Sequence, residues 1–331
     1  MCAMETPHPI PYQGSKRLLA STILNYFPRG QVRLLEPFAG AAAVSMAAAR
    51  RDRATQIVLN DINGPLMELW RAIINSPTAM VDAYEALWKA QLGRERRYYD
   101  VVRDRFNKEH EPACLLYLLA RCVKASVRYN SEGEFNQSPD NRRRGMNPET
   151  MRRHIFAASR LLKGKTTISI GDYQYALEEA KPRDVVYMDP PYQGVCTNRD
   201  PRYISLLDFE TFTRTLRKLN NRAISFILSY DGKTGDKSYG KPMPKDLGLV
   251  HIEVDAGRSS QATLLGQSRN TYESIYLSPA LLERIGTVSK RSLTIAPKQL
   301  SLIERDGQAK GSASVPPTAQ SGHGQATEDR H

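Results

Sequence analysis

The chain has 331 residues, of which 40% are hydrophobic and 25% are charged, and its formal net charge is +12 at pH 7. This composition is typical of a globular protein with a full core, and no apolar run approaches the ~20 residues that cross a bilayer, which argues against a membrane role. The positive charge favours a polyanionic partner such as nucleic acid, although a basic balance also serves solubility.

Three short apolar runs predict buried strands that end at polar residues: 32–36, 56–61 and 184–189. Helical patterns follow the first two runs, at residues 41–50 and 64–75. Strands that alternate with helices are typical of a parallel sheet with right-handed crossovers. Ligands of such sheets bind beyond the carboxyl ends of the strands, so we expect the polar residues there to line one crevice.

The next part of the chain, from residue 66 onward, carries amphipathic helical patterns such as 80–92 and 112–127, with basic and aromatic residues interleaved. Strand-like runs return later, at residues 223–229, 249–255 and 272–277. We therefore predict an α/β fold with a doubly wound, mostly parallel sheet and an inserted, mainly helical domain. The predicted domains are a catalytic domain of residues 1–65 and 160–287, an inserted domain of residues 66–159 and a tail of residues 288–331.

The two ends of the chain carry simpler signals. Residues 1–7 lack the basic start and apolar stretch of a secretory signal, so we expect a cytoplasmic protein. From residue 288 onward the aromatic residues stop, and Ser, Gly, Gln, Ala, Pro and charged residues dominate. A segment of this composition buries too little apolar surface to fold, and we predict that it is disordered.

The most informative segment is Asp189-Pro190-Pro191-Tyr192, directly after an apolar strand. Two consecutive prolines cannot continue a strand ladder, so they fix a rigid turn whose carbonyls lack local partners. The Asp189 carboxylate and the Pro190 carbonyl can accept both hydrogens of an aromatic amine, and Tyr192 offers a ring on which a planar base stacks. A capped turn at a strand end is the alternative, but the acid before the prolines and the aromatic ring after them favour a catalytic site.

Residues 36–44 (EPFAGAAAV) form a strand end, a turn of small residues and a helix start. Small residues let a ligand approach the backbone, although tight helix packing would explain them equally. Gly40 stands alone, so the segment is not the glycine-rich turn of dinucleotide oxidoreductases. Asp61 ends the next strand, where a carboxylate can bind ribose hydroxyls; as the alternative, it caps the helix that follows.

Two further turns, residues 11–16 (PYQGSK) and 171–173 (GDY), are uninformative alone, but the order of all five segments resembles the Dam-like family of DNA adenine-N6 methyltransferases. The resemblance extends from about residue 10 to 277. It implies S-adenosylmethionine as cofactor, no metal, and double-stranded DNA as substrate, with the target adenine flipped out of the helix. The implied catalytic residues are Asp189, Pro190, Pro191 and Tyr192, and the implied cofactor-binding residues are Tyr12, Gly14, Lys16, Glu36, Phe38, Gly40, Asp61, Asp172 and Tyr173.

Within the predicted insertion, residues 128–136 (RYNSEGEFN) look like a segment that Dam-like members carry near their DNA-contacting hairpin. The resemblance makes the insertion a DNA-recognition domain. An arginine run follows, which either contacts phosphates and a guanine edge or is simply a solvated loop. The implied DNA-binding residues are Arg128, Asn130, Phe135, Asn136, Arg142, Arg143 and Arg144.

The sequence departs from the family at two points. Ala42 replaces the second glycine of the first turn, which is tolerable only if its φ is negative and no ligand lies close. Residues 137–142 (QSPDNR) do not continue as in GATC-specific members, so GATC specificity is not expected.

Several readings stay open at this level. A methyltransferase acting on RNA adenine or protein glutamine would use a similar turn, although Asp189 and the 128–136 segment favour DNA adenine. A non-catalytic DNA-binding relative is the alternative from another class. The resemblance also admits a restriction-modification role with a cognate restriction endonuclease as partner, and we expect a monomer or a weak dimer.

Overall fold

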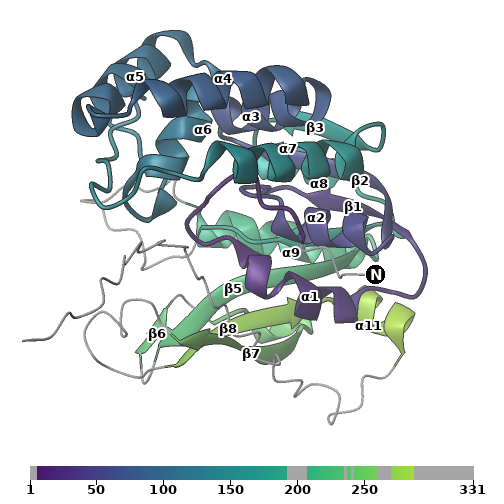
Figure 1. Cartoon of the computed structure of the whole chain (residues 1–331). Coiled ribbons are helices and arrows are strands. Elements are labelled where there is room, and N and C mark those ends of the chain that lie inside the picture. The colour runs from purple at the N-terminus through teal and green to yellow at the C-terminus, as the bar shows by residue number, and fades with distance from the viewer. Residues whose placement is uncertain (1–5, 192–206, 235–236, 240–241, 259–269, 287–331) are drawn as a thin grey trace, which may run out of the picture. The chain divides into compact units, whose positions relative to one another are not determined.

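The computed structural model describes residues 6–191, 207–234, 237–239, 242–258 and 270–286 (Figure 1). Its strands are β1 (Val32–Glu36), β2 (Ala54–Asp61), β3 (Thr166–Ile170), β4 (Val185–Met188), β5 (Ser225–Thr234), β6 (Lys237–Tyr239), β7 (Val250–Arg258) and β8 (Asn270–Leu277). They form one sheet of order β3-β2-β1-β4-β5-β8-β7, and β6 pairs with β5 outside this path. Strands β1 to β5 pair in parallel, whereas β8 runs antiparallel to both β5 and β7. The predicted α/β fold with a mostly parallel sheet is confirmed.

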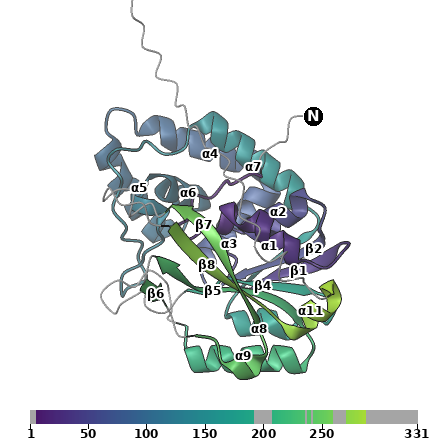
Figure 2. The same ribbon diagram turned by 90° about the horizontal axis from the view of Figure 1, so that it is seen from below.

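Helices cover both faces of the sheet. Figure 2 shows α8 and α9 on one face and α1, α2, α3 and α7 on the other. No described helix is long and apolar enough to cross a membrane. The α-helices are α1 (Ala20–Ile23), α2 (Ala43–Arg50), α3 (Gly64–Asn75), α4 (Pro77–Ala90), α5 (Glu95–Glu109), α6 (Pro112–Arg121), α7 (Pro148–Leu162), α8 (Tyr173–Glu178), α9 (Phe209–Asn221) and α11 (Pro279–Ile285).

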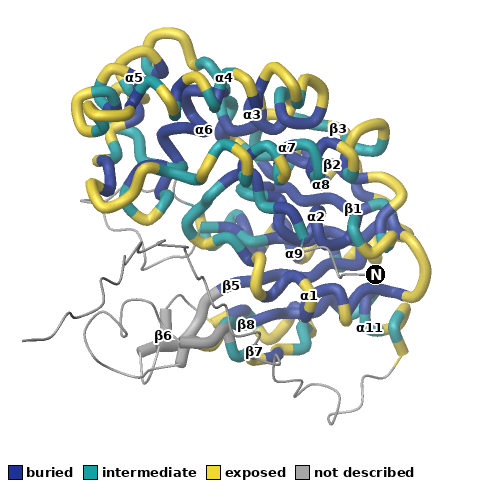
Figure 3. The backbone as a smooth tube through the Cα atoms, viewed as in Figure 1, coloured by how far each residue is buried: buried dark blue, intermediate teal, exposed yellow. Residues whose placement is uncertain are grey.

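Alternation along the central strands creates a hydrophobic cluster on each face. In β1, Leu34 packs into the cluster of α2 and α3, and Leu35 packs into the cluster of α8 and α9. In β4, Val186 faces α9 while Tyr187 faces the other side. Strands buried on both faces are typical of parallel sheets under helices, and Figure 3 shows their dark, buried traces.

The helices of the predicted insertion share the core of the sheet. Trp70 of α3 is fully buried and donates a hydrogen bond from its Nε1 to the carbonyl of Gly40, 2.9 Å away. Side chains of α3, α4, α6 and α7 belong to the same hydrophobic cluster as Leu34. The predicted domain boundaries stay a prediction, and the predicted tail lies outside the described residues.

The bounds of some predicted elements agree with the structure, and others differ where a residue has a positive φ. Helix α3 has the predicted bounds. The helix predicted at 112–127 ends earlier, at Arg121, because Cys122 is extended and Lys124 has a positive φ of 59°. The strand predicted from residue 223 begins at Ser225, since Ala223 also has a positive φ, 52°.

Candidate active site

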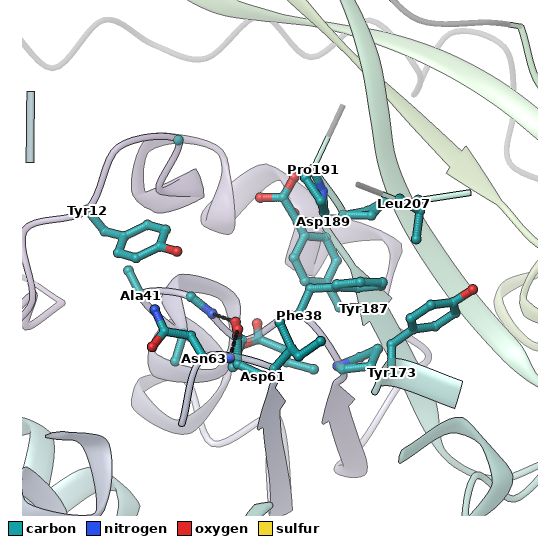
Figure 4. Close-up of a pocket in the computed structure, with 18 of the residues that line it drawn as sticks. Tyr12, Phe38, Ala41, Asp61, Asn63, Tyr173, Tyr187, Asp189, Pro191 and Leu207 are labelled. Atoms are coloured by element: carbon teal, nitrogen blue, oxygen red, sulfur yellow. Dashed lines mark hydrogen bonds between the residues drawn. The ribbon is translucent and has the colours of Figure 1, made fainter. Parts of the chain in front are cut away.

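A cavity of about 380 Å³ opens at the carboxyl ends of β1, β2 and β4 (Figure 4). Cavities of this size accommodate small organic ligands. In Figure 4, Tyr12 and Asp189 lie on opposite sides of the hollow, with Asp61 below them. Twelve of the predicted site residues line it: Tyr12, Gly14, Lys16, Glu36, Phe38, Gly40, Asp61, Asp172, Tyr173, Asp189, Pro190 and Pro191. Tyr192 lies outside the described residues.

The turn between β1 and α2 is held against the end of β2. The amide of Gly40 donates to Oδ2 of Asp61 at 3.0 Å, and the amide of Ala39 donates to the carbonyl of Asn60 at 2.8 Å. Gly40 has a φ of 46°, and a Cβ there would lie 3.3 Å from the Tyr12 ring. Both the backbone and the ring therefore favour glycine at position 40.

The conformation of Ala42 does not meet the condition stated above, that an alanine is tolerable here only with a negative φ. The residue adopts the left-handed conformation, with φ 48° and ψ 38°, directly before α2. It is fully buried and lines the cavity. A left-handed alanine costs about 1 to 2 kcal/mol, so this turn stores strain that glycine would not.

Asp61 binds backbone amides of two turns. Its Oδ1 accepts a hydrogen bond from the amide of Asn63 at 3.0 Å, in addition to the bond from Gly40. The cap of α3 is Asn63, whose side chain accepts from the Leu66 amide, so the alternative that Asp61 caps this helix is wrong. Burial raises the pKa of the Asp61 carboxyl, and these amide hydrogen bonds oppose the rise.

Glu36 is a buried acid that lines the cavity. Its Oε1 accepts a hydrogen bond from the amide of Ser45 at 3.0 Å, and its Oε2 is buried without a partner among the described residues. Burial raises the pKa of Glu36 to about 8. The group is therefore mostly protonated at neutral pH and would ionise beside a cation.

Asp172 and Tyr173 lie at the start of α8, and Phe38 from the turn after β1 completes an aromatic wall. Asp172 caps α8, since its Oδ1 accepts from the amide of Gln174 at 2.8 Å. Phe38 and Tyr173 stack with ring centroids 5.0 Å apart and lie side by side in Figure 4. The Asn60 side chain donates to the carbonyls of Pro37 and Gly171, at 3.1 and 3.0 Å, and so ties the turns after β1 and β3 together.

Asp189 follows β4 and meets the N-terminal turn. The Lys16 ammonium lies 2.9 Å from its Oδ1 and is only 7% exposed. The resemblance implied that Lys16 helps hold the cofactor, and the structure adds this ion pair with the predicted catalytic acid.

Tyr187 was missed by sequence reasoning. It lines the cavity two residues before Asp189, and its hydroxyl shares a 2.9 Å hydrogen bond with the hydroxyl of Ser229. Burial, and then the neighbouring charges of Asp189, Glu36 and Glu273, raise its pKa well above the ordinary value. The two-residue period of a strand places Tyr187 and Asp189 on one side, a signal that was present in the sequence.

The predicted DNA-binding segment 128–136 forms a narrow hairpin. Tyr129 and Phe135 pair across it, and the Asn130 side chain accepts from the amides of Glu132 and Glu134 at its tip. The Asn136 amide donates to the carbonyl of Arg128 at 3.0 Å.

Phe135 lies beneath this hairpin and not on its surface. It is 1% exposed and packs edge-on against the rings of Phe106 and Tyr129. The Asn107 side chain bonds both its amide and its carbonyl. Phe135 therefore anchors the hairpin, whereas Asn136 and the tip residues are exposed.

The arginine triplet, Arg142 to Arg144, is exposed on a loop. Arg142 and Arg143 pair with Asp140, at 3.0 and 3.4 Å, and Arg144 pairs with Glu95 at 3.4 Å. The three guanidinium groups face solvent, whereas the Asp140 carboxylate that holds Arg142 and Arg143 is only 6% exposed. The exposed arginines can therefore contact phosphates.

Several known methyltransferases are similar in sequence to this chain. It is 31% identical to the retron Ec67 DNA adenine methylase of Escherichia coli over 55% of this chain and 62% of that protein. It is 27% identical to the type II methyltransferase M1.LlaDCHI of Lactococcus lactis subsp. cremoris, over 77% of this chain and 90% of that protein. It is 28% identical to the DNA N-6-adenine-methyltransferase of Escherichia phage P1 over 55% of this chain, but spans only 23% of that longer protein.

The family comparison covers more of the chain than most of these pairs. The model of the D12 class N6 adenine-specific DNA methyltransferases matches residues 12–258, a stretch that holds every described cavity residue. The chain therefore belongs to the D12 class N6 adenine-specific DNA methyltransferase family.

Proposed function

We propose that this protein transfers a methyl group from S-adenosylmethionine to N6 of an adenine flipped out of double-stranded DNA. The observation that carries the proposal is that one cavity is lined both by the turns after β1 and β2 and by Asp189, Pro190 and Pro191. A methyl donor and an amine acceptor need to meet in one place, and here the two sets of residues face each other.

The cavity residues fit the chemistry of the cofactor. The buried Oε2 of Glu36 offers an acceptor for an ammonium group, and Asp61 offers a carboxylate for ribose hydroxyls. Phe38 and Tyr173 present an aromatic wall for a purine, beside Asp172. When bound, S-adenosylmethionine supplies a methyl group on a cationic sulfonium.

Asp189 and the proline turn would hold the adenine. The Asp189 carboxylate and the Pro190 carbonyl accept the two N6 hydrogens, which turns the nitrogen lone pair towards the methyl group. The adenine must first leave the duplex, which costs a few kcal/mol that hydrogen bonds in the pocket offset.

The transfer itself needs alignment and no covalent enzyme intermediate. Bound S-adenosylmethionine would supply the methyl group to the amine. Asp189 would hold the amine and would be placed to accept the proton that the methylated nitrogen loses. The protein contributes proximity and fixed charges.

The DNA would lie over the 128–136 hairpin and the arginine triplet. Residues 131–134, Asn136 and the triplet are exposed, and the triplet adds positive charge beside Arg96 in a shallow, basic hollow. The relatives named type II methyltransferases support a restriction-modification setting with a cognate endonuclease. Cytoplasmic location and a monomeric or weakly dimeric state stay predictions.

The proposal can be tested in a host that lacks adenine methylation. The host expresses the full chain or carries the empty vector, and its DNA is sequenced for N6-methyladenine. We expect methylated adenines in one recurring sequence, only with the chain present. Unmethylated DNA from a host that contains the folded protein would refute the proposal.

A further inference from the structure

Buried side chains hold the backbone of the 137–146 loop, which carries the arginine triplet. The Tyr84 hydroxyl of α4 donates to the carbonyl of Met146 at 2.7 Å, and the Tyr99 hydroxyl of α5 donates to the carbonyl of Gln137 at 2.8 Å. Neither tyrosine is more than 1% exposed. Both ends of the loop are therefore bonded to side chains in the core.

A third bond holds the loop between these ends. The Gln91 Nε2 donates to the carbonyl of Arg144 at 2.9 Å, and its Oε1 accepts from the Tyr117 hydroxyl of α6 at 2.9 Å. Gln91 and Tyr117 are fully buried. The Asp140 amide adds a 2.8 Å bond to the carbonyl of Arg121, at the end of α6. A buried polar network whose members are hydrogen-bonded specifies one conformation.

Gly145 lets the loop approach the helices closely. Its φ is 86°, and a Cβ there would lie 3.3 Å from the hydroxyl oxygen of Tyr84 and 3.4 Å from the side chain of Arg121. Both the backbone conformation and the close contact favour glycine. Helices α4, α5 and α6, which supply the bonds to the loop, stand together in Figure 1.

The side chains of the same loop face solvent although its backbone is fixed. Exposed residues line the basic hollow there: Asn141, Arg142, Arg143 and Arg144. Asparagine and arginine are the side chains that form paired hydrogen bonds with the major-groove edges of adenine and guanine. Contact with phosphates tolerates adjustment, whereas a paired contact with a base needs a backbone in a fixed place. The combination favours a loop that reads bases.

We propose that Tyr84, Gln91 and Tyr99 are positioning residues, which hold the 137–146 loop in the conformation that reads base pairs of the recognition sequence. This inference rests on the proposed function, because it takes double-stranded DNA as the ligand. The three side chains are buried, so they act through the loop and not by contact with DNA. Without their bonds the loop must be ordered on binding, which weakens the discrimination between right and wrong base pairs.

The test removes two hydroxyl groups and keeps the buried rings. Tyr84→Phe with Tyr99→Phe is made in the full chain, and bound sequences are selected from a pool of random, unmethylated duplexes. The wild type should enrich one sequence, and the variant should also enrich sequences that differ from it at one base pair. The affinity ratio between right and wrong base pair, ordinarily about ten- to a hundredfold, should fall about three- to tenfold in filter binding. The slope of log affinity against log salt should stay within about half a unit, since no charge is lost.

A second variant releases the middle of the loop. Gln91→Met with Tyr117→Phe removes the bond to the Arg144 carbonyl and replaces both partners of the buried pair by apolar groups of similar size. It should reduce the discrimination to a similar extent, again at an unchanged salt slope.

Two controls separate positioning from general stability. Tyr98→Phe makes the same change one residue earlier in α5, where the hydroxyl bonds no loop carbonyl within the described residues. Ser159→Ala removes a buried hydroxyl of α7 that donates to the carbonyl of Ile74 at 2.7 Å, a bond of the same kind away from the loop. Both should discriminate between base pairs as the wild type does.

The possible failures are distinguishable. Wild-type discrimination in both double variants would overturn the role of the three residues. So would a loss of affinity that is equal for all sequences, because the loop would then contact phosphates alone. An equal loss of discrimination in Ser159→Ala would overturn it as well. A wild-type protein that selects a sequence but methylates no DNA in the host would instead overturn the proposed function.

Discussion

The cavity at the strand ends and the 128–144 region are built in opposite ways. The cavity residues are anchored by backbone hydrogen bonds, as Asp61 is by the amides of Gly40 and Asn63. The exposed guanidinium groups of the arginine triplet, by contrast, are held by side-chain ion pairs to Asp140 and Glu95. One region is fixed before any ligand arrives, and the other can exchange its partners.

This difference separates chemistry from recognition. Transfer of a methyl group depends on atoms held within a fraction of an ångström, which suits buried groups on strand ends. Contact with a phosphate backbone depends mainly on the number of charges and tolerates adjustment. Substitutions in the cavity should therefore change rates, and substitutions in the triplet should change DNA affinity and its response to salt.

The largest effect is expected at Asp189. Asp189→Ala removes the acceptor that aligns the amine and should slow methyl transfer about a thousandfold, with DNA affinity nearly unchanged. Single-turnover rates with labelled S-adenosylmethionine and filter binding of DNA measure the two quantities. Normal turnover in this variant would refute the site. A parallel loss of DNA binding would contradict the statement that cavity substitutions change rates and not DNA affinity.

The triplet should show the reverse pattern. Replacing Arg142, Arg143 and Arg144 by Gln should weaken DNA binding about ten- to a hundredfold and lower the slope of log affinity against log salt by about 1 to 3. The rate of transfer from the bound complex should stay near that of the wild type.

A matched control for the triplet comes from the end of the sheet opposite the cavity. Arg29, Lys163 and Lys181 are exposed and precede β1, β3 and β4, at the ends opposite the cavity. Their joint replacement by Gln removes the same charge and should leave the salt slope within about half a unit. Equal slopes for the two triple variants would remove Arg142 to Arg144 from the interface.

Glu36 should couple cofactor binding to pH. A cation beside it favours the ionised form, so binding of S-adenosylmethionine at pH 7 should release a proton, and affinity should rise about tenfold from pH 6 to pH 8. Calorimetry in two buffers of different ionisation enthalpy measures the release, and Glu36→Gln should abolish it. Proton release that persists in Glu36→Gln would assign it to another group.

Without ligand, the same residue should act on stability in the opposite direction. The folded pKa of Glu36, about 8, lies above the ordinary value of 4.5. The folded state then holds a proton that the unfolded state has lost, so the free energy of unfolding should fall as pH rises from about 4.5 to 8. In Glu36→Gln that part of the decline should disappear from urea unfolding curves.

The smallest effect is expected for Ala42→Gly. Ala42→Gly relieves about 1 to 2 kcal/mol of left-handed strain but loses a buried methyl group of about 0.8 kcal/mol and adds freedom to the unfolded chain. The net change in the free energy of unfolding should stay below about 1 kcal/mol. Ala42→Val, which is β-branched, should destabilise by more than about 2 kcal/mol. Equal stability of the two variants would show that the turn relaxes.

Much of the fold and the cavity could be predicted because the signals are local. Apolar runs ending in Glu36, Asp61 and Asp189 identified strand ends, and parallel strands bring such ends to one edge. The pairing of Lys16 with Asp189 and Glu273 could not be predicted in this way. It depends on the sheet order, in which β4 lies next to β1 and β8 next to β5.

Two single residues show where pattern reasoning fails. The left-handed turn at Ala42 depends on how α2 joins the sheet, which no local composition encodes. Phe135 looked like a contact residue, but a ring in a short hairpin can point to the core or to solvent, and only packing against Phe106 decides.

The bond between Tyr129 and Asn63 joins the two regions compared above. The Tyr129 hydroxyl donates to Oδ1 of Asn63 at 3.3 Å, and Asn63 both caps α3 and lines the cavity. A hairpin displaced by a docked duplex would therefore pull on the start of that helix and on the amide that Asp61 binds. Thermodynamic linkage then requires reciprocity. If bound DNA changes the affinity for the cofactor by some factor, bound cofactor changes the affinity for DNA by the same factor.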